Sequence, residues 1–165
     1  MVKISKDYQI CYAHRLLNHQ GKCARLHGHN GMISISVDGN INEEESSPRH
    51  GMVLDFEDLD FGIGHWLDNV LDHRTILEIG DPLIRSIIDS EDEDSIIVID
   101  QPPTAEFLAM FIYTKVKDWL KVFKGEFQAS VTFWETPKAS ATVNDFSKFV
   151  AITVDSPGNV YAPII

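Results

Sequence analysis

The chain has 165 residues, 44% hydrophobic and 24% charged, which is typical of a single globular domain. Its formal net charge of −11 argues against a nucleic-acid partner and against an anionic membrane surface. No apolar run approaches the roughly 20 residues of a membrane-spanning helix, the first residues lack the apolar stretch of a signal peptide, and two cysteines cannot make a disulfide framework. We therefore expect one cytoplasmic domain over residues 1–165 with reduced thiols.

Two strands are predicted at the start of the chain. Residues 2–14 alternate between apolar and polar positions, and one phase holds Ile4, Tyr8, Ile10, Tyr12 and His14. Residues 27–39 alternate more regularly, with Ile33, Ile35 and Val37 on one face. The polar and turn-rich stretch that follows predicts a loop before the next element.

Two helices are predicted from apolar stripes and capping residues. Asp55 is a good N-cap for the first helix, although Gly62 and Gly64 weaken its helical propensity. Its stripe consists of Leu59, Ile63, Trp66, Leu67 and Val70. Thr104 caps the second helix, and Glu106 places a carboxylate in its first turn, where the helix dipole favours negative charge. The apolar positions of this second helix are Leu108, Ile112, Val116 and Leu120.

The remaining segments complete a ββααββ order. Residues 80–102 contain the acidic run "DSEDED", which we interpret as a solvated loop or small insertion beside the apolar "SIIVI". Strands are predicted over 126–135, in "ASATV" and in "KFVAITV", the last within a C-terminal extension of about 144–165. This order predicts an α+β fold, an antiparallel sheet with two helices on one face.

Three histidines share the inward phase of the two first strands. His27 and His29 are two residues apart and project to the same face of a strand, with Gly28 between them. Antiparallel pairing can bring His14 opposite this pair. Three histidines with an open fourth position are the arrangement of catalytic zinc, whereas a histidine such as His14 taken alone is more commonly a core residue satisfied by a backbone carbonyl than a ligand.

Other polar residues lie where they can carry chemistry. Glu135 continues the inward phase of its strand, and it is either a solvated strand end or a carboxylate that accepts paired N–H groups from a flat heterocycle. Adjacent Asp72 and His73 form either a chance surface pair or an oriented acid-base group. The positive neighbours Lys22 and Arg25 favour the thiolate form of Cys23.

These residues lie in six sequence blocks that together resemble the 6-pyruvoyltetrahydropterin synthase family. The blocks span about residues 4–143 and read "AHRL", "CARLHGHN", "GMVLDFEDL", "LDHRTIL", "PTAEFLA" and "WETPKASA". Three residues separate Cys23 from the His-Gly-His, which is similar to the 6-carboxytetrahydropterin synthases of the queuosine (7-deazaguanine) pathway. Animal pyruvoyl-type members have a longer gap, and a folate-synthesis branch has glutamate at the cysteine position. Gly31 departs from the family, which usually has an aromatic residue there.

The resemblance implies a tunnelling fold (T-fold), a homohexamer built from two trimers, and active sites between subunits. It implies zinc held by His14, His27 and His29. It also implies Cys23 as catalytic base, Asp72 with His73 as a proton relay that can serve a neighbouring chain, and Glu135 as the pterin anchor. Thr104 and Glu106 fall in a block that lines the pterin pocket.

The implied reaction starts from 7,8-dihydroneopterin triphosphate and gives 6-carboxy-5,6,7,8-tetrahydropterin, acetaldehyde and triphosphate. Because the chain is strongly acidic, a triphosphate needs a local basic patch. Our hypothesis is that Lys22 and Arg25, with Arg15 and Arg74, provide it.

Three alternatives remain open from sequence. A pyruvoyl-type enzyme eliminates triphosphate from the same substrate but keeps every side-chain carbon. A non-catalytic homologue binds zinc and pterin without turnover. A zinc hydrolase would want a carboxylate base next to the metal-bound water, and no glutamate adjoins "HGHN".

Overall fold

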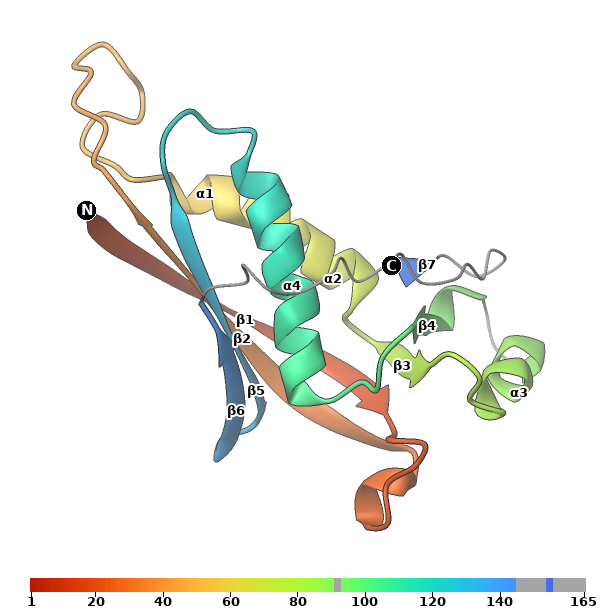
Figure 1. Ribbon diagram of the computed structural model, residues 1–165. Helices are drawn as coiled ribbons and strands as arrows, with labels where there is room; N and C mark the ends of the chain where they lie inside the picture. Colours follow the sequence, from red (N-terminus) through yellow and green to blue (C-terminus); the bar gives the residue numbers. More distant parts are fainter. Residues whose placement is uncertain (91–92, 145–153, 156–165) are drawn as a thin grey trace.

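The computed structural model describes residues 1–90 and 93–144, and the backbone of 154–155 (Figure 1). The strands are β1 Val2–His14, β2 His27–Gly39, β3 Arg74–Glu78, β4 Ile96–Ile99, β5 Gln128–Thr136, β6 Ala139–Val143 and β7 Val154–Asp155. The α-helices are α1 Phe56–Leu59, α2 His65–Val70, α3 Leu83–Ser90 and α4 Ala105–Leu120. Short turns of other helix types occur at Lys22–Ala24, Asp60–Gly64 and Glu93–Ser95.

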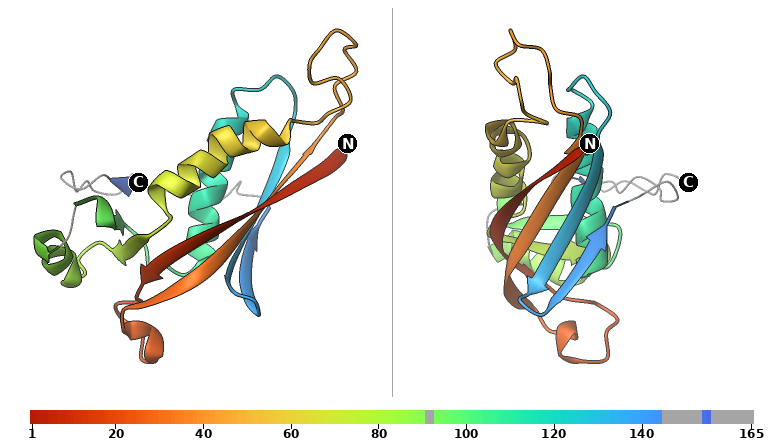
Figure 2. Two further views of the ribbon diagram at one scale, coloured as in Figure 1. Left: turned by 180° about the vertical axis from the view of Figure 1, so that it is seen from behind. Right: turned by 90° about the vertical axis from the view of Figure 1, so that its left-hand side faces the viewer.

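The strands form one sheet in the order β6-β5-β2-β1-β3-β4-β7. Its centre is the antiparallel pair β1 and β2, whose register runs from Val2 opposite Gly39 to His14 opposite His27. Strands β5 and β6 continue the antiparallel part beyond β2. Figure 2 shows these long strands twisting together, with the helices packed on one side. The predicted α+β class is therefore confirmed.

The sheet is mixed, so the expectation of a purely antiparallel sheet was wrong. The strand β3, which the sequence analysis did not predict, pairs parallel with β1, and β4 pairs parallel with β3. Both additions follow a helical connection, and such a crossover is what parallel neighbours require. The added strands extend the sheet beyond β1, at the end of β1 that carries His14.

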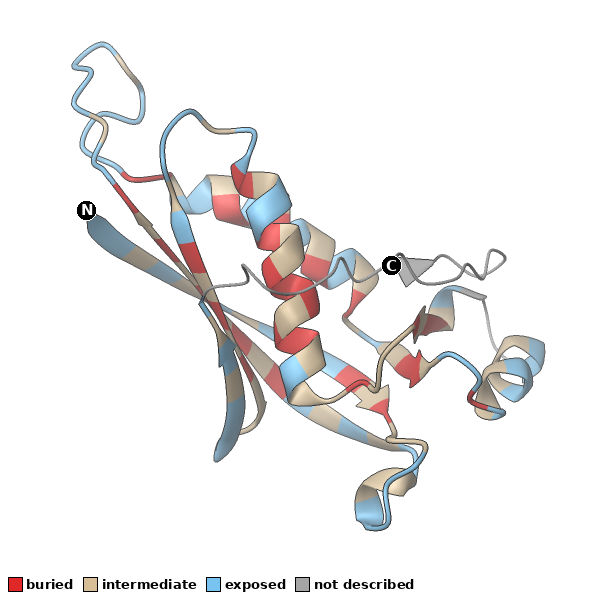
Figure 3. Cartoon of the chain, viewed as in Figure 1, coloured by how far each residue is buried: buried red, intermediate tan, exposed pale blue. Residues whose placement is uncertain are grey.

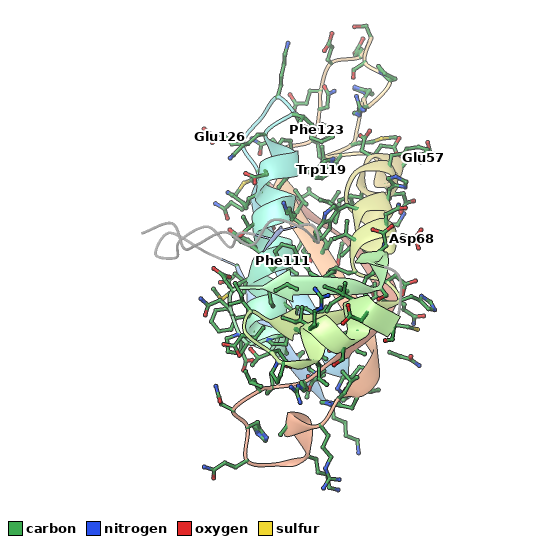
Figure 4. All side chains as sticks on the ribbon, turned by 90° about the vertical axis from the view of Figure 1, so that its right-hand side faces the viewer. Glu57, Asp68, Phe111, Trp119, Phe123 and Glu126 are labelled. Atoms are coloured by element: carbon green, nitrogen blue, oxygen red, sulfur yellow. The ribbon has the colours of Figure 1, made fainter. Side chains whose placement is uncertain are left out.

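The first predicted helix begins where expected but contains a turn of π-helix. Asp55 caps it, because its carboxylate accepts a hydrogen bond from the N–H of Glu57 at 3.0 Å. The π-turn Asp60–Gly64 joins α1 to α2. Helix α4 lies beside this segment, and Figure 4 shows Trp119 of α4 on the side that faces it, while Phe111 of α4 contacts the ring of Trp66 in α2. A Cβ on Gly62 would lie 2.1 Å from Nε1 of Trp119, so glycine permits this close approach.

The hydrophobic core lies between the helices and the inner face of the sheet. The predicted strand phase is confirmed, since Ile33, Ile35 and Val37 have no exposed surface. The predicted stripe of α4 is buried as well. Figure 3 shows this burial along the facing surfaces of α4 and the long strands.

The acidic segment contains more regular structure than the expected loop. Helix α3 and strand β4 lie within residues 80–102, and Asp81 before α3 is 3% exposed. Much of the C-terminal extension, and most of its predicted strand "KFVAITV", lies outside the described residues. The two-residue strand β7 pairs antiparallel with β4. Within the part of the chain that is described, no helix has the length and apolarity needed to span a membrane.

Candidate functional site

The three candidate histidines converge on the inner face of β1 and β2. His14 lies directly opposite His27, and Tyr12 lies opposite His29. The ring centroids of the three histidines are 4.6 to 5.1 Å apart. One nitrogen from each ring lies within 4.8 Å of the corresponding nitrogens of the other two. Strand pairing therefore assembles the cluster, as the strand phases predicted.

Backbone carbonyls determine which nitrogen of two rings is free. Nδ1 of His14 donates to the carbonyl oxygen of Pro103 at 2.7 Å, and Nδ1 of His27 donates to that of Arg25 at 2.7 Å. A carbonyl oxygen can only accept, so Nδ1 carries the hydrogen and, in the neutral ring, the lone pair is on Nε2. Nε2 of His14 and Nε2 of His29 are buried and have no hydrogen-bond partner among the described residues. This donor set fits a metal such as zinc, whose histidine ligands use one nitrogen and anchor the other.

Burial favours the neutral form of two of the rings by lowering their pKa. It lowers the pKa of His14, and the neighbouring His27 and His29 act in the same direction, against the hydrogen bond to Pro103 and the charge of Glu135. Burial also lowers the pKa of His29, although Glu135 opposes the shift. Neutral imidazole is the form that binds a metal ion.

Glu135 points into the same cluster. Its Oε1 lies 3.5 Å from Nε2 of His14 and 3.9 Å from Nε2 of His29. A lone pair facing a carboxylate is not a hydrogen bond, so this arrangement calls for a cation or an N–H donor between the groups. The pairing of β5 with β6 shifts register between Trp134 and Thr136, and such bulges often re-aim a side chain beside a site.

The start of α4 adjoins the histidines through Pro103. Thr104 caps the helix as predicted, with its hydroxyl accepting from the N–H of Phe107 at 3.3 Å. Glu106 is exposed in the first turn of the helix. The carbonyl that anchors His14 therefore belongs to the residue just before this cap.

Cys23 lies in a loop between β1 and β2. It occupies the middle of the short helical turn Lys22–Ala24 and is half-buried, while its carbonyl oxygen accepts from the N–H of Leu16 at 2.8 Å. Within the described chain its thiol is free and makes no hydrogen bond to a histidine. Lys22 and Arg25 flank it, as the sequence shows.

Asp72 and His73 form the predicted pair, and among the described residues no hydrogen bond or ring contact joins them to the three histidines. Nδ1 of His73 lies 2.7 Å from Oδ2 of Asp72, and Oδ1 of Asp72 accepts from the N–H of Cys11 at 2.6 Å. Burial opposes ionisation of Asp72, but these hydrogen bonds outweigh it and leave its pKa below the usual value. His73 lines a hollow with Cys11 and Asn30, whose side chains are on the opposite face of the sheet from His14, and His29 also borders this hollow.

The backbone of His73 is held in an unusual conformation. Its φ of 57° lies in the left-handed region, which is uncommon for a residue other than glycine. Its N–H donates to the carbonyl oxygen of Cys11 at 2.6 Å. The imidazole is directed into solvent, with 79% of its side chain exposed.

In the described parts of the chain, the side chains of two of the four basic residues of the hypothesised patch are bound to other groups, and the other two are not. Arg15 forms an ion pair with buried Asp81, including a contact of 2.7 Å from Nε to Oδ2. Arg74 donates to the carbonyl oxygen of Asn69 at 3.0 Å. Lys22 and Arg25 form no ion pair with another described residue. The candidate patch is thus reduced to the two residues beside Cys23.

Comparison with known proteins identifies the family. Residues 3–145 match the family model described as 6-pyruvoyl tetrahydropterin synthase. The chain belongs to this family.

Relatives and solved structures agree with this assignment. A probable 6-carboxy-5,6,7,8-tetrahydropterin synthase of Halobacterium salinarum is 37% identical over 139 residues, 84% of either chain. The 6-carboxy-5,6,7,8-tetrahydropterin synthase of Rickettsia bellii is 30% identical, over 87% of this chain and 100% of its own. A catalytic-residue mutant of the Plasmodium vivax 6-pyruvoyltetrahydropterin synthase has a TM-score of 0.67 at 22% identity, and the match covers 87% of this chain and 97% of its own. The predicted T-fold is confirmed.

Two residues of the candidate site in this 6-pyruvoyltetrahydropterin synthase family member were not predicted from the sequence. Pro103 contributes through its carbonyl oxygen, which no side-chain pattern reveals. Tyr12 was placed on the inner face but not in the site, yet its ring contacts His14 and His29. Its place between His14 and Ile10 in the inward phase was the only available signal.

Proposed function

We propose that the protein is a zinc-dependent lyase that converts 7,8-dihydroneopterin triphosphate and water into 6-carboxy-5,6,7,8-tetrahydropterin, acetaldehyde and triphosphate. The observation that carries the proposal is the convergence of three histidine nitrogens and one carboxylate on the inner face of the sheet. The names of the curated relatives support the carboxy-type product. We further propose that the product enters queuosine (7-deazaguanine) synthesis.

His14, His27 and His29 would hold zinc through Nε2. When bound there, zinc supplies Lewis acidity that polarises side-chain oxygens of the substrate and acidifies the neighbouring C–H bonds. The carbonyl oxygens of Pro103 and Arg25 fix the tautomers of two ligands, which is the usual arrangement around metal-binding histidines.

Glu135 would bind the pterin ring. A carboxylate accepts two parallel N–H bonds, and a pterin offers an amino group beside a ring N–H. Because Glu135 shares the inner face with the histidines, it would set the distance between the ring and the reacting side chain. Thr104 and Glu106, at the start of α4, would line the same pocket.

Cys23 and the pair Asp72 with His73 would move protons. We assign Cys23 as the base that removes a proton from the substrate side chain, favoured by the positive charges of Lys22 and Arg25. Those two residues would also receive the triphosphate. Asp72 orients the imidazole of His73, which would exchange the second proton.

Asp72 and His73 would act on the site of a neighbouring subunit. In one chain His73 lines a hollow with Cys11 and Asn30, whose side chains are on the opposite face of the sheet from His14, and His73 is largely exposed. A homohexamer of two trimers with intersubunit active sites would bring both halves together. This assembly is part of the proposal.

The deciding experiment incubates zinc-loaded protein with 7,8-dihydroneopterin triphosphate and measures the products by mass. We expect 6-carboxytetrahydropterin and acetaldehyde in equal amounts, and loss of both with Cys23→Ala. A product that retains all side-chain carbons would replace this function by the pyruvoyl type. Bound pterin without turnover would indicate a non-catalytic homologue.

A further inference from the structure

The ring of Tyr12 lies over Gly31 on the neighbouring strand. A Cβ added to Gly31 would meet Cε1 of Tyr12 at 3.1 Å, the carbonyl oxygen of Trp134 at 3.4 Å and Cζ of Phe133 at 3.5 Å. The separation from Tyr12 is tighter than ordinary van der Waals contact, and the other two are ordinary contacts. The missing side chain at position 31 therefore gives the tyrosine ring its space.

The same ring joins the histidine cluster to β5. Its centroid is 5.2 Å from that of His14, 5.7 Å from that of His29 and 5.5 Å from that of Phe133. Phe133 precedes Glu135 by two residues on β5 and shares its face. Tyr12 thus forms part of the floor between the candidate metal ligands and the candidate pterin anchor.

The hydroxyl of Tyr12 is not explained by packing. The residue is 3% exposed, and its oxygen is buried without a hydrogen-bond partner among the described residues. A buried hydroxyl without a partner is destabilising, and phenylalanine would fill the same space without that cost. The buried atoms that share this condition here include Nε2 of His14 and Nε2 of His29, which are candidate ligand atoms.

We propose that the Tyr12 hydroxyl is a substrate-binding group that donates a hydrogen bond to the heterocycle held by Glu135. The inference rests on the proposed function, because it requires a pterin in this pocket. A pterin carries ring nitrogens and a carbonyl oxygen that accept, and Glu135 can satisfy only its N–H groups. Tyr12 supplies the donor that Glu135 lacks.

The test compares Tyr12→Phe with wild-type protein, both loaded with zinc. Titration with 7,8-dihydroneopterin, which lacks the triphosphate, should show about tenfold weaker binding to Tyr12→Phe, the effect of one buried hydrogen bond. The melting temperature should stay the same or rise, because the variant removes an unsatisfied hydroxyl. Tyr8→Phe is the matched control, since Tyr8 lies on the same face of β1 but beside Asp60 and Gly64, and its binding should match wild type.

Equal pterin binding by Tyr12→Phe and wild type would overturn the inference, as would equal weakening by Tyr8→Phe, which would indicate a packing effect. If the wild-type protein turns over the substrate and Tyr12→Phe binds pterin as tightly as wild type, only the role of Tyr12 is refuted and the proposed function stands. If the wild-type protein binds pterin without turnover and Tyr12→Phe binds it more weakly, the proposed reaction is refuted but the contact with Tyr12 is supported. Failure of wild type to bind pterin would overturn both.

Discussion

Two backbone carbonyls decide which nitrogens of the histidine cluster are available. The carbonyl oxygens of Pro103 and Arg25 each accept a hydrogen bond from Nδ1, so in the neutral rings of His14 and His27 the lone pair is on Nε2. Nε2 of His29 is buried beside them without a partner among the described residues. Such a set is costly without a ligand and favourable with a cation, because unsatisfied buried acceptors lose their hydration.

We expect zinc to stabilise the protein through these histidines. At a free zinc concentration about 100 times its Kd, linkage predicts about 2.7 kcal/mol and therefore a rise in melting temperature of roughly 5–10 °C. His29→Ala should abolish most of this rise in a thermal melt with and without zinc. His65→Ala is the control, because His65 lies in α2 and contacts Asn69. An undiminished rise with His29→Ala would rule out this site.

The burial of His14 and His29 also predicts a pH dependence of stability without metal. Their pKa values are lowered in the folded chain, so the unfolded chain binds more protons below the ordinary histidine pKa of about 6.5. Stability should therefore fall as the pH decreases from about 7 to 5, by up to about 1.4 kcal/mol per pH unit for each histidine. Urea unfolding at several pH values should give a smaller slope for His14→Phe. His65→Ala is the control, and its stability should depend on pH with the same slope as that of the wild type.

At the level of elements, the contact between α4 and the π-turn decides how the two helices pack. Trp119 approaches the backbone at Gly62, and Trp66 of α2 packs edge-on against Phe111 of α4 at 5.3 Å between centroids. Glu57 and Asp68, labelled in Figure 4, lie on the exposed side of the same segment. Gly62 has a low helical propensity, but its lack of a side chain is what allows Trp119 of α4 to approach so closely.

Gly62→Ala should destabilise the fold by about 2 kcal/mol, because the added methyl group overlaps the Trp119 indole and forces a shift in packing. Urea unfolding measures the change. Combining it with Trp119→Phe should recover part of the loss, since the two sites are in contact. Asp68→Ala, exposed on the same segment, should change stability by less than about 0.5 kcal/mol. Additive losses in the double variant would contradict the proposed overlap.

At the scale of the whole molecule, the sheet separates the candidate catalytic groups into two faces. The histidines and Glu135 occupy the inner face, while His73 lines a hollow with Cys11 and Asn30. The chain carries a net charge of −11, so a triphosphate depends on local positive charge near Lys22 and Arg25. A second chain is the simplest source of the missing half of the site.

Mixing two inactive variants tests this arrangement. His29→Ala and His73→Ala should each abolish turnover, but subunits unfolded and refolded together should recover roughly a quarter of wild-type activity by random pairing in a closed oligomer. Turnover in the mixed sample, set against each variant refolded alone, is the measurement. Activity should not recover when His29→Ala is mixed with Glu135→Gln, because one chain supplies both residues to a site and neither variant has both intact. Absence of recovery in the first mixture would place the whole site within one chain.

The sequence alone determined the strand phases, the helix caps and the histidine cluster. Period-two alternation places His14, His27 and His29 on one face whatever lies around them, because side-chain direction in a strand is local. Asp55 and Thr104 were identified for the same reason, since capping depends on a few adjacent residues. The six motif blocks indicated the family.

Only the tertiary structure decided how these elements meet. The parallel strands β3 and β4 depend on crossover connections, so the local pattern could not predict their partners. The place of His73 beside Cys11 and Asn30, and that of the Tyr12 ring above Gly31, depend on residues far apart in sequence. Long-range packing sets such contacts, and it is also what brings the carbonyl oxygen of Pro103 to His14, 89 positions away.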